Sequence, residues 1–189
     1  MTGVDAMKMV VSSQMSDKKE HNNLLREALK QLPERKLDRE TGVRLMTVGS
    51  ENDDIPFLEM VKSLGATVVI EDHCTGSRYF WNEVIPEEDR LSAIAARYID
   101  RIPCPSKDWE ERERMPFILQ LAKDYHVEGV LLTQMKFCDP HELDIPAIRE
   151  ALESNGIPTY FLEFDVAVPL GPSRVRIEAF IEQLTLDLV

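Results

Sequence analysis

Short apolar runs alternate with segments of helical periodicity along most of the chain. Four of these runs are rich in β-branched and large apolar residues and carry little charge: VRLMTV (43–48), ATVVIE (66–71), GVLLTQ (129–134) and PTYFLEF (158–164). Near-continuous apolar runs of this length are typical of strands that are buried on both faces of a parallel sheet. The pattern therefore predicts four central strands.

The segments between these runs carry apolar residues at helical spacing, as crossover helices do. We expect helices over residues 55–64, 88–100, 110–126, 144–155 and 173–188. Gly65 and Gly156 each precede a strand, where a glycine commonly follows the end of a helix. The predicted fold class is α/β, a doubly wound, flavodoxin-like or Rossmann-like domain whose four-stranded parallel sheet is flanked by helices.

The strand at 43–48 is expected at the centre of the sheet, beside 66–71 and 129–134, with 158–164 outermost. The chain thus divides into a helical lead-in over residues 1–40 and an α/β domain over residues 41–189.

The lead-in contains a helical run from about Asp5 to Ser13 and a second, more polar helix that ends at Pro33. Ser16 is a plausible N-cap of the second helix. Its apolar stripe consists of Leu24, Leu25, Ala28, Leu29 and Leu32. Because such one-faced helices do not form a domain alone, they must pack on the rest of the chain or on a partner.

Composition narrows the class of protein. The chain has 189 residues, 43% of them hydrophobic and 30% charged, which suits one folded domain. The net charge of −12 opposes binding to nucleic acid or to anionic membranes, which carry the same sign. No run approaches the roughly 18 apolar residues of a membrane span, and no signal-peptide pattern is recognised. We therefore expect a cytoplasmic protein without a nucleic-acid or membrane partner.

Candidate chemistry falls in three polar loops that follow the first three strands. Ligands of open parallel sheets bind outside the carboxyl ends of the strands. The loop GSENDD (49–54) lacks the glycine patterns of dinucleotide and nucleotide-phosphate sites, and its simpler interpretation is a turn with Asp53 or Asp54 as a helix N-cap.

The loop DHCTGSRYFW (72–81) is richer in functional groups. Arg78 can bind a phosphate or carboxylate through its forked guanidinium, and the aromatic residues Tyr79, Phe80 and Trp81 can form the wall of an apolar pocket. The same aromatic residues can equally be core residues, and the sequence leaves both interpretations open.

The third loop, MKFCDPHE (135–142), contains one of three cysteines, Cys74, Cys104 and Cys138. They lie far apart in sequence without a C-x-x-C pair, so a disulfide framework or a zinc site is not indicated. Cys138 is the best single ligand candidate because a strand end fixes its position, although burial as a core residue is the more common role of such a cysteine. No residue is assigned a catalytic role.

Three stretches together resemble a known family. They are SENDDIPFLEMVKSLGATVVIEDHCTGSRYFWNEV, QMKFCDPHELDIPAIREALESNGIPTYFLEFD and GPSRVRIEAFIEQL. They are similar to the C-terminal half of the 2-hydroxyacyl-CoA dehydratase D-component family, which includes active-site subunits of ATP-dependent benzoyl-CoA reductases.

The resemblance implies an oxygen-sensitive enzyme of anaerobic metabolism whose complete subunit holds a [4Fe–4S] cluster through three cysteines. Cys138 matches the family's C-terminal cluster cysteine, and thiolate is the ligand that such clusters prefer. In the family the other two ligands come from an N-terminal domain, and Cys74 and Cys104 match positions outside the ligand set. We therefore expect this chain to hold no cluster when it is alone.

The resemblance also implies the reaction and its partners. An ATP-dependent activator protein delivers an electron, and the radical (ketyl) dehydration or reduction of an acyl-CoA thioester follows. A homologous dehydratase or reductase subunit is the expected partner. Within the three loops, the substrate-binding candidates are Ser50, Arg78, Tyr79 and Trp81.

The leading hypothesis is the C-terminal domain of an iron–sulfur lyase or oxidoreductase subunit that is incomplete alone. The alternative is a non-catalytic flavodoxin-like scaffold that has lost the cluster-binding domain. In isolation we expect a homodimer or small homo-oligomer through the helices of residues 5–32, because unpaired apolar faces on a folded chain find partners.

Overall fold

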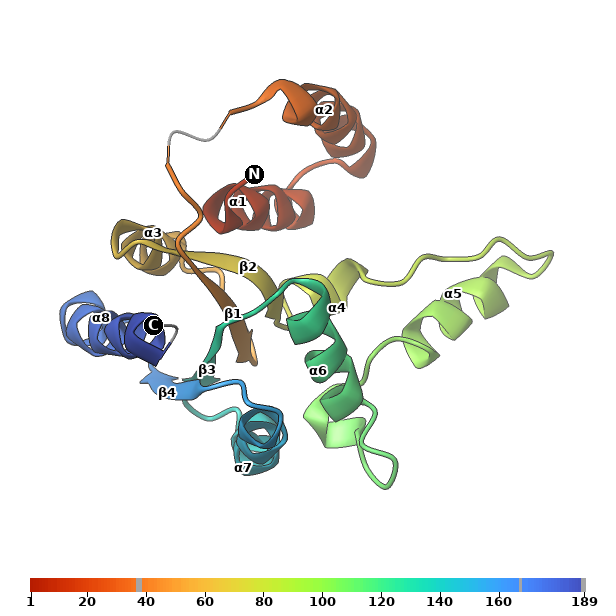
Figure 1. Ribbon diagram of the computed structural model, residues 1–189. Helices are drawn as coiled ribbons and strands as arrows, with labels where there is room; N and C mark the ends of the chain where they lie inside the picture. The colour runs from red at the N-terminus through yellow and green to blue at the C-terminus, as the bar shows by residue number, and fades with distance from the viewer. Residues whose placement is uncertain (37–38, 167, 188–189) are drawn as a thin grey trace.

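A four-stranded parallel sheet forms the centre of the molecule. A computed structural model describes residues 1–36, 39–166 and 168–187 (Figure 1). The strands are β1 (Val43–Gly49), β2 (Ala66–Asp72), β3 (Gly129–Met135) and β4 (Thr159–Phe164), in the order β2-β1-β3-β4. All three neighbouring pairs are parallel. The predicted fold class and strand order are confirmed.

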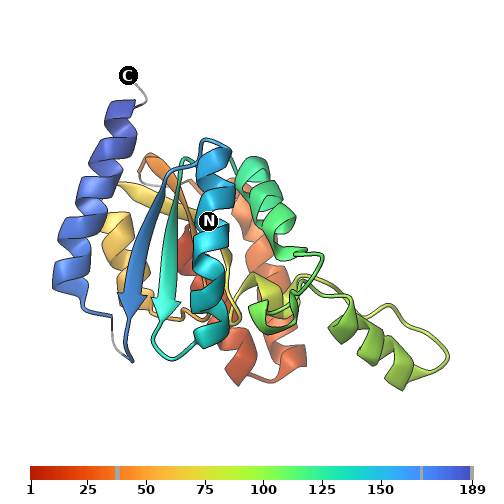
Figure 2. The same cartoon turned by 90° about the horizontal axis from the view of Figure 1, so that it is seen from below.

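Helices cover both faces of the sheet (Figure 2). The longer helices are α1 (Gly3–Met15), α2 (Lys18–Gln31), α3 (Ile55–Ser63), α5 (Arg90–Ile99), α6 (Arg114–Asp124), α7 (Asp139–Ser154) and α8 (Leu170–Asp187). A short helix α4 (Ser77–Phe80) and two 3₁₀ turns, η1 (Leu32–Glu34) and η2 (Pro105–Lys107), lie in the connections. The described part of the chain contains no helix that is both long and apolar enough to cross a membrane.

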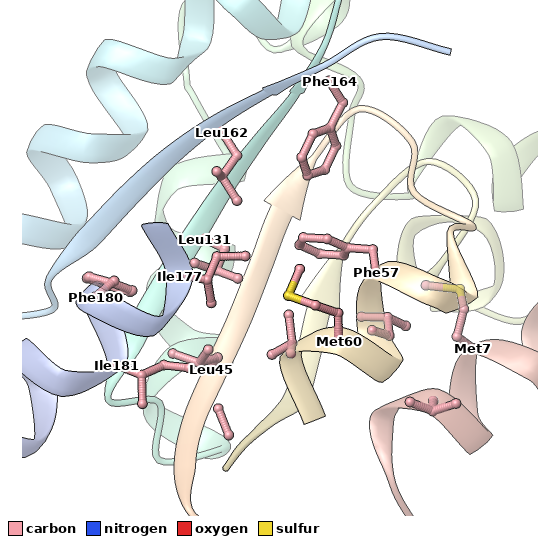
Figure 3. Packing of buried hydrophobic residues seen from close by; sticks show 14 of the residues in the cluster. Met7, Leu45, Phe57, Met60, Leu131, Leu162, Phe164, Ile177, Phe180 and Ile181 are labelled. Atoms are coloured by element: carbon pink, nitrogen blue, oxygen red, sulfur yellow. The ribbon is translucent and has the colours of Figure 1, made fainter. Parts of the chain in front are cut away.

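Two hydrophobic clusters lie on opposite faces of the sheet. One joins α1, α3 and α8 to the sheet; in it Phe57 meets Phe164 edge-to-face, with ring centroids 5.1 Å apart (Figure 3). The other joins α6 and α7 to residues such as Met46 and Leu132. Strands that point apolar residues to both faces can be buried only between two helical layers, so the doubly wound architecture follows from the runs themselves.

The helix ends follow local signals in the sequence. Asp54 caps α3, with its carboxylate accepting a hydrogen bond from the backbone N–H of Phe57 at 2.8 Å. Gly65 and Gly156 have positive φ angles of 84° and 75°, as glycines after a helix do. The expected N-cap at Ser16 was wrong. Ser16 ends α1, and Asp17 caps α2 because its carboxylate accepts from the backbone N–H groups of Lys19 and Glu20.

One helix begins earlier than predicted, and the two leading helices differ in their burial. The helix expected over 144–155 begins at Asp139, because Pro140 suits the first turn of a helix, so the loop after β3 is only a few residues long. The two leading helices also differ from each other. Helix α1 contributes Val4 and Met7 to the core, whereas α2 buries none of its residues.

Candidate functional site at the carboxyl edge of the sheet

The loops after β1 and β2 are joined by direct hydrogen bonds. The backbone N–H of Cys74 donates to the carbonyl of Ser50 at 2.7 Å, and that of Asn52 donates to the Thr75 hydroxyl at 3.3 Å. Arg78 donates to the carbonyl of Gly49, the last residue of β1. These contacts make the two loops one structural unit.

The loop after β3 reaches the same edge from the other side of β1. Because β1 pairs with β2 on one side and β3 on the other, the chain reverses its winding direction between β1 and β3. Doubly wound proteins bind ligands at such a switch point. Cys138 lies three residues beyond the end of β3 and immediately precedes α7. The expected meeting of the three polar loops at one edge of the sheet is confirmed.

A buried ionic network lies beneath the loops. Asp72, at the end of β2, forms ion pairs with Arg78 at 3.0 Å and with Arg114 at 2.8 Å. Arg114 continues to Asp144 on α7 at 3.2 Å, and Asp144 also pairs with Arg112. Arg114 and Asp72 are fully buried, so each charge needs oppositely charged partners in this position. The network therefore connects β2, α6 and α7.

Two buried histidines belong to the same edge. The Nε2 atom of His73 lies 3.0 Å from the Thr47 hydroxyl, and the Nδ1 atom of His141 lies 2.7 Å from the side-chain oxygen of Gln134. Burial lowers the pKa of both rings, and the positive charges of Arg78 and Arg114 lower it further, to about 3 for His141. Both imidazoles are therefore neutral at physiological pH and can donate or accept one hydrogen bond at their second nitrogen.

Buried polar atoms at this edge lack partners among the described residues. They are the Ser50 hydroxyl, the Asn52 side-chain nitrogen, Nδ1 of His73 and Nε2 of His141. Buried polar groups are normally paired, so an unpaired group here can bind water, a ligand or a partner chain. Four such atoms in connected loops mark the carboxyl edge as the best candidate site in the described chain.

Glu71 holds the β2 loop in shape from inside. Its carboxyl group accepts hydrogen bonds from the backbone N–H groups of His73 and Ser77. Burial raises the pKa of Glu71 to about 7, although both hydrogen bonds act in the opposite direction. A Cβ atom at Gly76 would clash with this carboxyl group, so any side chain there would displace the carboxyl from its two backbone donors.

The three cysteines lie on three loops, and all are free thiols. Burial raises the pKa of the Cys74 thiol, and the nearby thiols of Cys104 and Cys138 add to the rise. For Cys104 burial also acts to raise the pKa, but hydrogen bonds with Ser106 bring it below its ordinary value. The fold thus brings together cysteines that are about thirty residues apart in sequence.

A metal centre needs several ligands at bonding distance. Within residues 1–36, 39–166 and 168–187, no group of three or more His, Cys, Asp or Glu side chains is arranged to hold a metal ion. The thiols therefore do not form a ready cluster site within the described chain. Cys138 can supply one ligand to a cluster, but the other ligands would have to come from elsewhere.

The turn that carries Cys138 has an unusual backbone. Phe137 has a φ of +69°, in the left-handed region that bulky residues rarely adopt, and its side chain is 90% exposed. The carbonyl of Cys138 accepts hydrogen bonds from His141, Glu142 and the Gln134 side chain. The cysteine therefore sits in a well-fixed turn beside an aromatic ring that lies in solvent.

The four substrate-binding candidates do not all lie together. Ser50 and Arg78 are buried at the carboxyl edge, where the guanidinium of Arg78 already pairs with Asp72. The ring of Tyr79 instead contacts α2, with its centroid 5.7 Å from the ammonium nitrogen of Lys18. Trp81 packs edge-to-face on Phe117, with ring centroids 5.5 Å apart. The interpretation of the aromatic residues as core residues was wrong, because Tyr79, Phe80 and Trp81 are 37%, 48% and 43% exposed. Tyr79 and Phe80 instead line a surface groove.

Arg114 belongs to this site although no sequence motif pointed to it. It lies in the charged run ERERM, which is typical of a solvated helix start, yet its side chain is fully buried. Asp144 was likewise indistinguishable from a surface acid. For Arg114 the only indication in the sequence was its spacing. It lies four and seven residues before Ile118 and Leu121, on the face of the helix that is otherwise apolar.

Comparisons with known proteins find a matching family model and several relatives. A family model described as "2-hydroxyglutaryl-CoA dehydratase, D-component" matches residues 1–184. The (R)-phenyllactyl-CoA dehydratase beta subunit of Clostridium sporogenes is 27% identical over 175 residues, 92% of this chain and 46% of that protein. A benzoyl-CoA reductase subunit of Thauera aromatica is 25% identical over 88% of this chain and 45% of that protein. The beta subunit of (R)-2-hydroxyglutaryl-CoA dehydratase from Acidaminococcus fermentans is 23% identical over similar shares, 88% and 45%. The chain thus spans about half the length of these curated relatives.

Proposed function

Because the chain belongs to the 2-hydroxyglutaryl-CoA dehydratase D-component family, we propose that it is the C-terminal domain of an active-site subunit of a 2-hydroxyacyl-CoA dehydratase or benzoyl-CoA reductase. In this role it supplies one thiolate, from Cys138, to an iron–sulfur cluster whose remaining ligands lie outside the chain. The cluster would supply the electron-transfer chemistry, after reduction by an ATP-dependent activator.

The position of Cys138 carries this proposal. It lies at the switch point of the sheet, at the start of α7, in a turn whose backbone is fixed by three hydrogen bonds to its carbonyl. A ligand thiol needs this kind of fixed support and access from outside the domain. The acyl-CoA substrate would approach the same edge, where the unpaired Ser50 hydroxyl and Asn52 amide are candidates to bind an acceptor oxygen such as a thioester carbonyl.

The remainder of the subunit and a homologous second subunit are the expected partners. The relatives that match are named as subunits, and each is about twice as long as the region that matches this chain. A protein with a single ligand thiol at its sheet edge needs such a partner to complete the site.

The test is anaerobic isolation of the tagged chain from its source cells together with its assembled partners. Iron and sulfide content and the paramagnetic resonance signal of the reduced complex are measured for wild type, Cys138→Ser and Cys74→Ser. We expect Cys138→Ser to reduce the cluster content of this subunit and the ATP-dependent dehydration or reduction of acyl-CoA. Cys74→Ser is the matched control and should retain both.

A complex whose cluster content and activity are unchanged by Cys138→Ser would contradict the proposal. It would favour the alternative, a non-catalytic scaffold. The observation behind this alternative is that the described residues contain no group of three or more side chains arranged to hold a metal ion.

A further inference from the structure

Two helices of the molecule have almost no buried surface. Helix α2 buries none of its residues, and α5 buries only Ala93. In both views α5 stands away from the sheet at the end of an extended arm, residues 82–99 (Figures 1 and 2). Helix α2 contacts α1 through His21, whose Nε2 atom lies 3.1 Å from the carbonyl of Met9, but the other faces of α2 and most of α5 are uncovered. Helices of these lengths are not stable by propensity alone, so the uncovered faces favour a further contact surface.

Each of these helices carries an apolar stripe. On α5, Leu91, Ile94 and Tyr98 follow one another at intervals of three and four residues and are 78%, 45% and 56% exposed. On α2, Leu25 and Leu29 are four residues apart; Leu25 is half-buried and Leu29 is 51% exposed. Apolar residues at helical spacing in contact with water are characteristic of an interface.

The two helices border the same groove. It has a volume of about 790 Å³, and Leu25 of α2 and Ile94 and Tyr98 of α5 are among its lining residues. Met9 and Val10 of α1 line it as well. The groove is large enough to receive side chains of another helix and is mostly apolar.

The base of the arm is fixed by hydrogen bonds. The guanidinium of Arg97 donates to the carbonyls of Asn82 and Tyr79, and the Asn82 side chain donates to the carbonyl of Arg97 at 2.7 Å. On the other wall, Lys18 of α2 lies over the ring of Tyr79. The groove is therefore held open before any partner binds, which lowers the entropic cost of binding.

The charges of the two walls are opposite. Helix α2 has four basic residues and two acidic ones, although the whole chain carries a net charge of −12. The arm segment 82–90 has four acidic residues, Glu83, Glu87, Glu88 and Asp89, and one basic residue. One surface of the molecule thus carries both halves of a complementary pair. In an interface related by a two-fold axis, the acidic arm of each copy can face the basic α2 of the other.

We propose that a second copy of this chain occupies the groove. The arm of one copy lies along α2 of its partner, so that α2 and α5 of both copies form a four-helix cluster about a two-fold axis. A self-complementary surface explains why the acidic and basic segments and the two apolar stripes occur on one face. The inference does not depend on the proposed catalytic role.

Sedimentation equilibrium of the purified chain tests this arrangement across a wide range of protein concentrations. The wild type should be a dimer. Leu91→Glu combined with Ile94→Glu should weaken dimerisation by about 100-fold or more, as expected for the loss of central apolar anchors. Leu186→Glu is the matched control. It changes a leucine of α8 that is 75% exposed, against 78% for Leu91, and it should leave the dimer unchanged.

Charge reversal identifies the pairing directly. Glu87→Lys with Glu88→Lys should weaken the dimer, and adding Lys18→Glu with Lys19→Glu should restore part of the lost affinity. All four positions are exposed, so the variants should fold, and circular dichroism checks that they do. A monomeric wild type at every concentration, or a dimer that resists the arm variants, would overturn the proposal. Loss of affinity without rescue by the second pair of changes would overturn the pairing of the arm with α2.

Discussion

At the level of single residues, Arg114 is the most consequential side chain of the structure. It is the largest fully buried side chain among the described residues, and it lies between the carboxylates of Asp72 and Asp144. A buried ion pair need not exceed an apolar alternative in stability, but removing one partner leaves a charge without compensation. The network therefore connects three elements of the fold, and the loss of one of its members is costly in stability.

We expect Arg114→Met to lower the free energy of unfolding by about 3 kcal/mol, because each of two buried carboxylates loses one of its two cationic partners. Urea unfolding measures the change. Lys8→Gln is the control. It breaks an ion pair with Glu59 in which both side chains are more than half exposed, and it should cost less than about 1 kcal/mol. Equal decreases in the free energy of unfolding for the two variants would show that the buried network stabilises the fold no more than an exposed ion pair does.

Three buried groups set the pH dependence of stability. His73 and His141 have lowered pKa values in the folded chain, so the unfolded chain binds more protons and stability falls as pH drops below 6.5. Glu71 acts in the opposite direction. Because the pKa of Glu71 is about 7 in the folded chain, this group contributes stability that is fully present below pH 4.5, its ordinary pKa. The contribution is lost as pH rises through 7. Between pH 4.5 and pH 6.5, acidification therefore lowers stability through the two histidines and raises it through Glu71.

We therefore expect stability to fall with acidification in this range at about 1.4 kcal/mol per pH unit, the slope of one net proton. Glu71→Gln removes the compensating group and should make the slope about twice as steep. His141→Asn should make it shallower, because one of the two histidines that act against Glu71 is then lost. Chemical unfolding at a series of pH values measures these slopes. A flat profile in all variants would contradict the role of the buried rings.

At the level of helices and strands, short local signals determine where helices begin. The sequence left Asp53 and Asp54 as equal candidates for the N-cap of α3. The structure selects Asp54, because its side chain reaches the N–H of Phe57, three residues later. The path of the chain after β1 decides which of the two adjacent acids caps the helix. The amino-acid sequence at this point does not show that path.

Asp54→Ala should therefore destabilise the protein by about 1 kcal/mol, since the N–H of Phe57 loses its acceptor at a helix start. Asp53→Ala changes the neighbouring, exposed acid and should have almost no effect. Thermal unfolding of both variants measures the difference. The opposite ranking would show that the loop adopts another conformation in solution.

Considered as a whole, the molecule has one candidate cluster ligand and about half the length of its curated relatives. We predict that the chain purified alone in air carries little iron, because a single thiolate does not hold a cluster and an exposed cluster oxidises readily. Iron and sulfide assays after anaerobic reconstitution measure this. Near-stoichiometric [4Fe–4S] that is lost in Cys74→Ser, Cys104→Ser and Cys138→Ser alike would show that the chain is self-sufficient through its own three thiols.

The parallel sheet, its strand order and the edge at which the loops meet could all be predicted from the order of residues. Apolar runs without alternation require burial on both faces, and helical segments between them require parallel strands. These are local patterns repeated several times, so single errors such as the N-cap at Ser16 do not change the fold. The three stretches that resemble the family also sufficed to recognise it, which the match over residues 1–184 confirms.

Which polar residues belong to the interior became known only from the folded chain. The burial of Arg114, Asp72 and Asp144, the neutral state of His73 and His141, and the separation of Tyr79 from Arg78 depend on contacts between segments distant in sequence. A charged residue in a sequence looks the same whether water or an opposite charge surrounds it. The free energy of a buried charge depends on the position of its partner, and that position exists only once the chain has folded.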